Sequence, residues 1–490
     1  MVRMNAKQFL EKFSYALESD FSSAGNPATW APKHPKYWGQ EKAKIPIGVN
    51  TNTVALSPDD KFVAVGIDRA IHIFDVTTQE LVEVLRAHSG TVEKVQFSPA
   101  LVDENQRDTR YKMASQADEN VGEEEPVGTI ILWDLNEHGR LVSTKERMNP
   151  VDPDVLTQKT VQSLVSELTA KHGWDASEKA IGIIDEAMRN ALRTAVDVHE
   201  REDKISFRGE LASFESPAFS PDGKTLIYLG QNDSTQEELR NAASLPSVNL
   251  WDVESKTLRH ELLGHTDSIM WTSMSPDSTR LASLSWDGTA RVWDADPGAC
   301  IHVLGPFGGQ LWRGAFSPDG KYLVISQGSP KTHIHVYEID TERPISRFDG
   351  FGRWARSLSW SPDGTMLAGG SEDGTLCIWD PFSGQEKMQW RLAIEDRMMR
   401  CFAHVRGLQF VDGGRKLMFQ LVGGTVEVYD FESNTKQQFT RKAEDQIEKS
   451  PYARVVCSAD SKLLVIPDAD GSLRLWDLRL EQEEINVFPG

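Results

Sequence analysis

Short runs in which apolar and polar residues alternate recur along most of this chain. In residues 269–294, IMWTSMSPDSTRLASLSWDGTARVWD, three such runs are separated by an SPDS turn and a WDGT turn. The arrangement returns in residues 355–380 as ARSLSWSPDGTMLAGGSEDGTLCIWD. Alternation with a period of two, bounded by Gly, Pro, Asp and Ser, is typical of β-strands joined by tight turns. The pattern therefore predicts one set of antiparallel strands, repeated.

The third strand of each repeat ends in an aromatic residue followed by an acidic one. From Trp251 onward these ends lie 42 to 50 residues apart. A period of this length indicates one array of repeats and not several domains of ordinary size. The eight ends are Phe74-Asp75, Trp133-Asp134, Trp251-Asp252, Trp293-Asp294, Tyr337-Glu338, Trp379-Asp380, Tyr429-Asp430 and Trp476-Asp477.

This period and the GH…WD marks resemble the WD-repeat (WD40) family, whose members are β-propellers of four-stranded blades. The resemblance covers residues 42–488, apart from one insertion, and implies an all-β fold in a single propeller. Eight blades are expected, or seven if the divergent region 405–440 is not a blade. The segment KIPIGVN (44–50) aligns with the entry to a fourth strand. It is expected to supply the outer strand of the last blade and so close the ring.

Two segments are expected to lie outside the repeats. Residues 1–41 are interpreted as an N-terminal helix and linker packed on the ring, because apolar residues recur there at helical spacing. Residues 147–203 are interpreted as a helical hairpin inserted between blades 2 and 3, where Asp152-Pro153 is a helix-start signal. The hairpin either packs on the propeller or acts as a docking arm. Family geometry places it on the top rim, with the acidic loop 118–126 and the loop 231–246.

Within a repeat, the family buries a hydrogen-bonded set of His, Ser or Thr, Asp and Trp. The resemblance assigns this tetrad to His265, Ser283 (or Ser285), Asp287 and Trp293. Ser, His and Asp also form catalytic triads, but a triad needs an exposed serine and an oxyanion hole. The family pattern favours the structural role. Blades 5, 6 and 8 have no histidine at the aligned position, which predicts weaker rigidity there.

The resemblance also indicates which residue of each first strand reaches the mouth of the ring on the top face. Aligned to Met270, these positions are Asn52, Glu93, Glu215, Met270, Trp312, Arg356, Arg406 and Ala453. Glu residues occupy blades 2 and 3, whereas Trp and Arg, the residue types most frequent in interface hot spots, occupy blades 5 to 7. The set predicts a bipolar partner-binding surface, with Trp271 and Trp354 widening its aromatic side. The alternative is that some of these side chains pack between blades.

The last repeat ends in Trp476-Asp477-Leu478-Arg479. This resembles the WDxR box of substrate receptors for cullin-RING ubiquitin ligases, in which the Arg contacts the ligase adaptor. Asp470 falls where that box has an Asp. The resemblance implies an alternative function as such a receptor, with Asp477 and Arg479 as adaptor contacts. An Arg after Asp also suits an ordinary solvent-facing turn.

Charge and composition narrow the function class. The formal net charge is −20, from 53 basic and 73 acidic residues. This makes nucleic acid an unlikely ligand, because phosphate-backbone binding depends on clustered Lys and Arg. It favours protein partners with basic segments near blades 2 and 3. No apolar run is long enough to span a bilayer and charged residues interrupt any signal-peptide core, so a cytoplasmic or nuclear protein is expected.

Signals for catalysis and cofactors are weak. The four cysteines include no CxxC pair, which indicates neither a zinc site nor a disulfide framework. The sequence has no Gly-rich phosphate loop, GxSxG or HExxH motif, so we expect no catalytic residues, metal or cofactor. The remote alternative is an enzyme with a channel-mouth site at Glu93 and Glu215. The sequence thus favours a non-catalytic protein–protein interaction scaffold that binds through its top face.

Overall fold

The structure is a computed structural model. It describes residues 22–23, 26–31, 41–48, 51, 53–86, 88–102, 109–119, 127–142, 205–212, 216–230, 245–328, 331–391, 405–421, 426–439, 455–458, 460–468 and 470–478. The helical hairpin expected at 147–203 and the helix expected before Ser22 lie outside these ranges. In the described part of the chain, no helix has the length and apolar character needed to cross a lipid bilayer.

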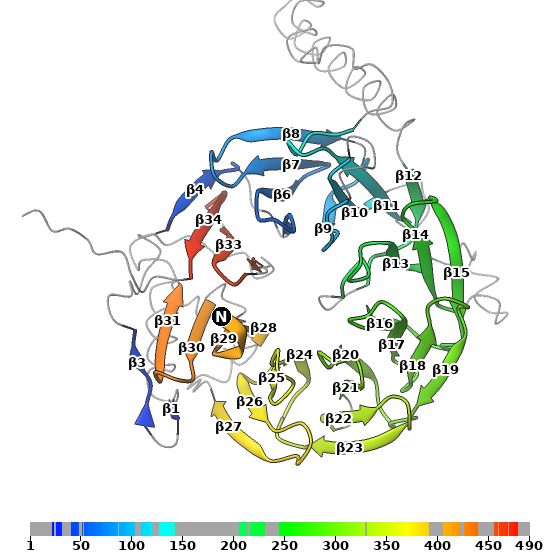
Figure 1. Ribbon diagram of the computed structural model, residues 1–490, viewed down its shortest axis with the longest axis vertical. Helices are drawn as coiled ribbons and strands as arrows, with labels where there is room; N and C mark the ends of the chain where they lie inside the picture. The colour runs from blue at the N-terminus through cyan, green and yellow to red at the C-terminus, as the bar shows by residue number, and fades with distance from the viewer. Residues whose placement is uncertain are drawn as a thin grey trace, which may run out of the picture.

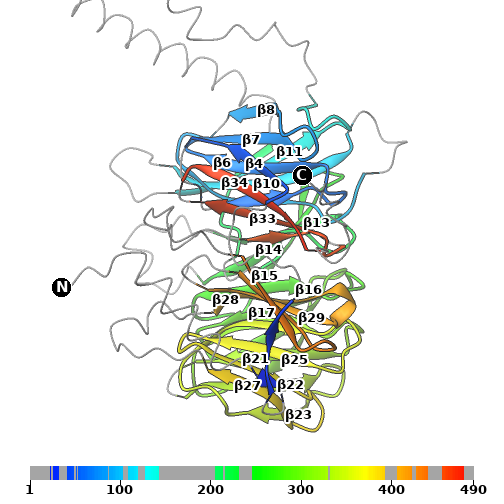
Figure 2. The same ribbon diagram turned by 90° about the vertical axis from the view of Figure 1, so that its left-hand side faces the viewer.

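Eight small antiparallel sheets follow one another around a common axis (Figure 1) and form a disc when seen from the side (Figure 2). The expected all-β propeller of eight blades is therefore confirmed, and the divergent region 405–440 supplies one of the blades. Blade 1 contains β5 (Val54–Leu56), β6 (Phe62–Ile67), β7 (Ala70–Asp75) and β8 (Leu81–Arg86). Blade 2 contains β9 (Val92–Phe97), β10 (Tyr111–Glu119), β11 (Val127–Leu135) and β12 (Ile205–Arg208). The expected placement of the 147–203 insertion between blades 2 and 3 is therefore wrong, because β12, which follows it in the chain, is the outer strand of blade 2.

The next blades follow in chain order. Blade 3 contains β13 (Thr225–Gly230), β14 (Ser247–Asp252) and β15 (Thr257–Leu263). Blade 4 contains β16 (Ile269–Met274), β17 (Arg280–Ser285), β18 (Ala290–Asp294) and β19 (Cys300–Leu304). Blade 5 contains β20 (Leu311–Phe316), β21 (Tyr322–Gln327), β22 (His333–Glu338) and β23 (Arg343–Phe348). Blade 6 contains β24 (Ala355–Trp360), β25 (Leu367–Ser371), β26 (Thr375–Trp379) and β27 (Glu386–Arg391).

The last two blades include strands from the N-terminal region. Blade 7 contains β28 (Val405–Val411), β29 (Lys416–Leu421), β30 (Val426–Asp430) and β31 (Thr435–Phe439), with a 3-10 turn η4 (Asp412–Gly414), and β3 (Thr29–Trp30) pairs with β31 in parallel. Blade 8 contains β32 (Val456–Cys457), β33 (Leu463–Asp468), β34 (Ser472–Asp477) and β4 (Ala43–Pro46). Two further strands, β1 (Ser22–Ser23) and β2 (Asn26–Pro27), pair with each other.

The core lies between neighbouring blades. One cluster joins Trp271 and Leu284 of blade 4 to Leu311 and Ile325 of blade 5, all buried. Inner strands such as β33 are buried along their whole length, whereas an outer strand such as β15 is mostly exposed. Each blade therefore needs a neighbour on both faces, and a closed ring provides one for every blade.

The SPD motifs close the turn between the first and second strands. In blade 4 the Ser275 hydroxyl donates to Asp277 Oδ1 (2.5 Å) and accepts from the backbone N–H of Arg280 (3.0 Å). The hydrogen bond from Ser275 lowers the pKa of Asp277. The serines with the same two bonds in other blades are Ser57, Ser220, Ser317, Ser361 and Ser458.

The N-terminal region closes the ring, as the sequence predicts. β4 is antiparallel to β34, with Ile45 opposite Leu473 (Figure 1, blue beside red). An ion-pair cluster reinforces this junction, because the buried Arg474 guanidinium donates to Asp468 (2.8 Å), Glu41 (2.7 Å) and Asp470 (2.7 Å). Lys44 adds a bond to Asp470 (2.8 Å). We call Glu41, Lys44, Asp468, Asp470 and Arg474 the ring clasp.

Candidate functional site

Each of the described residues predicted to face the mouth of the ring lies at a register shift in the first strand of its blade. In blade 4, Ile269 faces Ser285 and Trp271 faces Leu284, so Met270 between them has no partner residue. The same register shift skips Glu93, Trp312, Arg356 and Arg406 in the strand registers of blades 2, 5, 6 and 7. A β-bulge of this kind re-aims a side chain away from the regular alternation of the strand. The same β-bulge thus recurs in these blades at the positions predicted from the sequence.

Blades 4 to 6 carry an aromatic–guanidinium stack. The ring of Trp312 stacks on Trp354, with centroids 4.6 Å apart and planes at 26°. Arg356 lies 4.4 Å from the Trp312 ring centroid and 5.0 Å from that of Trp354, and its Nε also donates to Glu372 (2.5 Å). Trp286 meets Trp312 at 5.2 Å and 61°. These four residues, Trp286, Trp312, Trp354 and Arg356, are called the top-face stack.

Burial within the stack is uneven. Trp312 is only 6% exposed, whereas Trp286, Trp354 and Arg356 are half-buried. The expectation that Trp271 widens this aromatic surface is wrong, because Trp271 is 3% exposed and packs in the core beside Gly314. The physical reason is the bulge, since Trp271 follows Met270 and points to the opposite side of the strand.

The acidic side of the mouth is described in part. Glu93 is exposed at the bulge of β9, and its partial burial, followed by the charge of Asp118, raises its pKa. Glu210, which bridges to Leu229 of blade 3, also raises the pKa of Glu93. Asn52, Glu215 and Ala453 lie outside the described residues, as does the side chain of Arg406. The pair of Glu93 and Glu215 is therefore not described.

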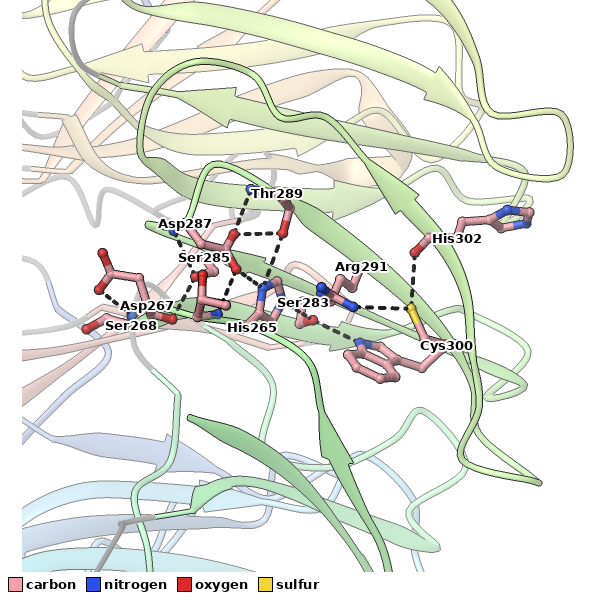
Figure 3. A network of polar contacts seen from close by, with 12 residues as sticks. His265, Asp267, Ser268, Ser283, Ser285, Asp287, Thr289, Arg291, Cys300 and His302 are labelled. Carbon is pink, nitrogen blue, oxygen red and sulfur yellow. Dashed lines mark hydrogen bonds and ion pairs between the residues drawn. The ribbon is translucent and has the colours of Figure 1, made fainter. Parts of the chain in front are cut away.

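The structure brings the four tetrad side chains together in blade 4 (Figure 3). His265 Nδ1 lies 2.8 Å from Asp287 Oδ2, and His265 Nε2 lies 2.8 Å from Ser283 Oγ. The Trp293 indole donates to the same Ser283 oxygen (2.9 Å). Ser283 is 0% exposed, which leaves no approach for a substrate to its hydroxyl. Ser285, the alternative member, instead donates to the carbonyl of Asp267 (2.7 Å).

The tetrad fixes the charge of Asp287. Burial by itself raises the pKa of this carboxyl, but hydrogen bonds from His265, Thr289 and the backbone N–H of Thr266 outweigh it. The net effect holds the pKa of Asp287 well below its usual range. Asp287 is therefore an ionised group whose lone pairs are committed to the blade.

Blades 5 and 6 replace the tetrad histidine with phenylalanine. Counted from the SPD motif, Phe307 and Phe351 occupy the position of His265. Phe351 meets Trp379 edge to face at 5.3 Å, and Phe307 meets Tyr337 edge to face at 5.7 Å. An aromatic contact thus stands where blade 4 has a polar one. The tetrad motif includes only histidine at this position, so the motif does not predict a phenylalanine there.

The residues of the predicted ligase-adaptor contact are also described in part. Asp477 ends β34 and is half-buried, whereas Arg479 lies outside the described residues. Asp470, which matches the Asp of the WDxR box, belongs to the ring clasp. Burial raises its pKa, but the bonds from Lys44 and Ser472 and the charge of Arg474 prevail and hold the pKa at about 2.

The described residues contain no group of three or more His, Cys, Asp or Glu side chains arranged to hold a metal ion. Burial raises the pKa of both the Cys377 and the Cys457 thiol to about 12. Thiols with such pKa values are protonated at neutral pH, and the thiolate is the nucleophilic form of cysteine.

Known proteins are similar to this chain in the same repeats. The family described as WD domain, G-beta repeat matches residues 256–294 and 342–380. The fission yeast (Schizosaccharomyces pombe) protein named target of rapamycin complex subunit wat1 is 26% identical over 41% of this chain and 59% of its own length. The rice (Oryza sativa subsp. japonica) small ribosomal subunit protein RACK1y is 29% identical over 27% of this chain and 40% of its own length. The chain thus spans about half the length of these curated relatives.

Among solved structures, the chain is similar to Chaetomium thermophilum Sqt1, determined bound to the N-terminus of ribosomal protein L10. The TM-score is 0.56 and the identity 14%, over 89% of this chain and 99% of Sqt1. At this identity the likeness concerns the fold alone.

Proposed function

The chain belongs to the WD-repeat (WD40) family of β-propellers, and from this premise we propose that it is a non-catalytic scaffold that binds protein partners through its top face. The single observation that carries the proposal is the top-face stack. Three tryptophans and an arginine from three blades meet there, and Trp312 and Arg356 stand at bulges of their first strands. Trp and Arg held rigidly at one place are the composition of an interface hot spot.

The proposed surface is bipolar. Arg356 is stacked and paired with Glu372, so it is held in one orientation and loses little side-chain entropy when a partner binds. Its outer edge suits acidic or aromatic partner side chains. On the opposite part of the ring, burial first and then the negative charge of Asp118 raise the pKa of Glu93, and a Lys or Arg of a partner would favour its ionised form. We expect basic partner segments there.

Affinity purification of full-length variants tests the proposal. Arg356→Glu places a carboxylate beside Glu372 and removes the cation that stacks on two indoles, and Trp354→Ala removes one of those indoles. Each variant should lose at least one partner that wild type retains. The matched control is Arg343→Glu, because Arg343 lies on the β22–β23 side, on the opposite rim. An unchanged set of partners for folded Arg356→Glu and Trp354→Ala would refute the proposed surface.

A second candidate function rests on the sequence at the end of blade 8. Trp476-Asp477-Leu478-Arg479 matches the WDxR box, and Asp477 is half-buried at the end of β34. We propose Arg479→Ala as its test. The substitution should abolish co-purification of a cullin-ligase adaptor and leave the melting temperature unchanged. If no adaptor co-purifies with wild type, this candidate is wrong.

A further inference from the structure

A hollow of about 350 Å³ opens beside the top-face stack. It lies between blades 4 and 5, where the turn at 286–289 that joins β17 to β18 faces the loop at 305–310 that joins β19 to β20. Trp286 belongs to both features, since it lines the hollow and contacts Trp312. A partner bound on the stack can therefore extend into the hollow.

The lining includes the glycines Gly288, Gly308 and Gly309, which offer only backbone atoms. A Cβ on Gly288 would lie 3.2 Å from the carbonyl oxygen of Gly309, and the N–H of Phe307 donates to the carbonyl of Gly288 (2.9 Å). Gly288 and Gly308 have φ values of +80° and +76°, which favour glycine. A Cβ on Gly308 would meet nothing within 4 Å, so this glycine borders open space.

The lining carries no available charge. Asp287 is its only ionisable residue, and that carboxylate accepts bonds from His265, Thr289 and the backbone N–H of Thr266. A phosphate or carboxylate would find no cation among the lining residues, and a Lys or Arg would find the carboxylate already committed. The lining therefore suits an uncharged ligand.

Two polar groups of the lining are available. In the described structure, Trp286 Nε1 is buried and has no hydrogen-bond partner. The Gln310 side chain, half-buried at the edge of the hollow, makes no hydrogen bond to any described residue. An unpartnered buried donor gains a bond when a ligand brings an acceptor to it. A ligand carbonyl can reach this N–H only if the half-buried indole turns toward the hollow.

A site with an indole face, an indole N–H and a side-chain amide, and whose carboxylate is already bonded, has the chemistry that binds polyproline II segments. Such segments have no internal hydrogen bonds, so their carbonyls remain free to accept, and their rings pack on aromatic faces. Resting on the proposed top-face function, we propose that this hollow binds a proline-containing segment of a protein partner, with Trp286 as carbonyl donor and Gln310 as a second polar contact.

Titration of the full-length chain with blocked decaproline tests the inference. Binding is measured from the indole N–H signals in the NMR spectrum of ¹⁵N-tryptophan-labelled protein. Decaproline should shift one indole signal, and Trp286→Phe should lack that signal. Trp286→Phe keeps the aromatic face but loses the donor, so binding should weaken about three- to tenfold. Trp286→Ala should weaken it further, and Gln310→Ala should weaken it less.

The matched control is Trp251→Phe, which should bind decaproline as wild type does, because Trp251 lies in β14 of blade 3 and does not line the hollow. Blocked peptides of Gly-Ser repeats and of lysine should leave the indole signals unmoved. Failure of decaproline to bind folded wild type, or equal binding by Trp286→Phe, would overturn the inference. A lysine peptide that binds instead would identify a basic occupant and overturn it too. The proposed function fails separately, through unchanged partners of Arg356→Glu and Trp354→Ala.

Discussion

At the scale of single residues, committed hydrogen bonds hold the turns of this propeller. The SPD serines each bridge an aspartate and a backbone N–H, as Ser275 does between Asp277 and Arg280. His265 joins Ser283 to Asp287 across two strands. Buried polar groups are costly when they lose a partner, so these residues stabilise the blade only as complete sets.

We predict that His265→Ala lowers the free energy of unfolding by about 2–4 kcal/mol, because it leaves Asp287 and Ser283 without their shared partner. Urea denaturation at pH 7 measures this. Asp267→Asn is the control, since Asp267 is exposed and should change stability by less than about 0.5 kcal/mol.

The lowered pKa of Asp287 makes the stability that its contact with His265 contributes depend on pH. A depressed pKa in the folded state gives stability that is present above about pH 4, where the unfolded carboxyl is ionised, and lost as the pH falls further. In wild type this loss should add to acid unfolding below pH 4. In His265→Ala the contribution should be smaller, and an identical acid slope in both proteins would contradict the assigned role.

At the scale of elements, equivalent blades reach similar geometry with different side chains. Blade 4 uses the polar tetrad, whereas blade 6 uses an aromatic cluster in which Phe351 packs between Gly369 and Trp379. The absence of a histidine from blades 5 and 6 predicted weaker rigidity, but the aromatic contacts supply packing at the same position. Edge-to-face pairs add to the stability gained from buried area alone.

Phe351→Ala is predicted to destabilise the protein by about 3–5 kcal/mol, the usual effect of removing a buried aromatic side chain. Phe382→Ala is the matched control, because Phe382 is 47% exposed and its loss should change stability by only about 0.5 kcal/mol. Thermal unfolding of both variants compares them directly. Equal melting temperatures for the two would contradict the packing role of Phe351.

At the scale of the whole molecule, the ring is closed by residues far apart in the sequence. β4 completes blade 8 and β3 extends blade 7, so the N-terminal region covers two adjacent blades (Figure 1). In the ring clasp, Glu41 pairs with buried Arg474 and Lys44 pairs with Asp470. A buried cation paired with three carboxylates strongly destabilises a protein when its partners are removed.

Removal of one side of the clasp should therefore open the ring. We predict that the double substitution Glu41→Ala and Lys44→Ala speeds hydrogen exchange in β34 and β4 more than in β17, which lies in blade 4. The double substitution Lys256→Ala and Glu261→Ala, on the exposed outer part of blade 3, is the control. Exchange that rises equally in every blade would show general destabilisation and not local opening.

The sequence by itself determined the repeat, the eight strand ends that mark possible blades, the strand that closes blade 8 and the tetrad apart from the choice between Ser283 and Ser285. These features depend on alternation and turn motifs, which are local signals that recur with a fixed period. It also placed Met270, Trp312 and Arg356 at equivalent positions, which the shared bulge explains.

Only the tertiary structure decided which of those side chains are accessible. Trp271 is core, Trp312 is covered by its neighbours, and Trp286 from a turn joins the stack. The parallel pairing of β3, two residues long, has no sequence signal, and neither does the convergence on Arg474. The physical reason is that burial, bulges and ion pairs depend on which blades become neighbours, and closure of the ring sets that order.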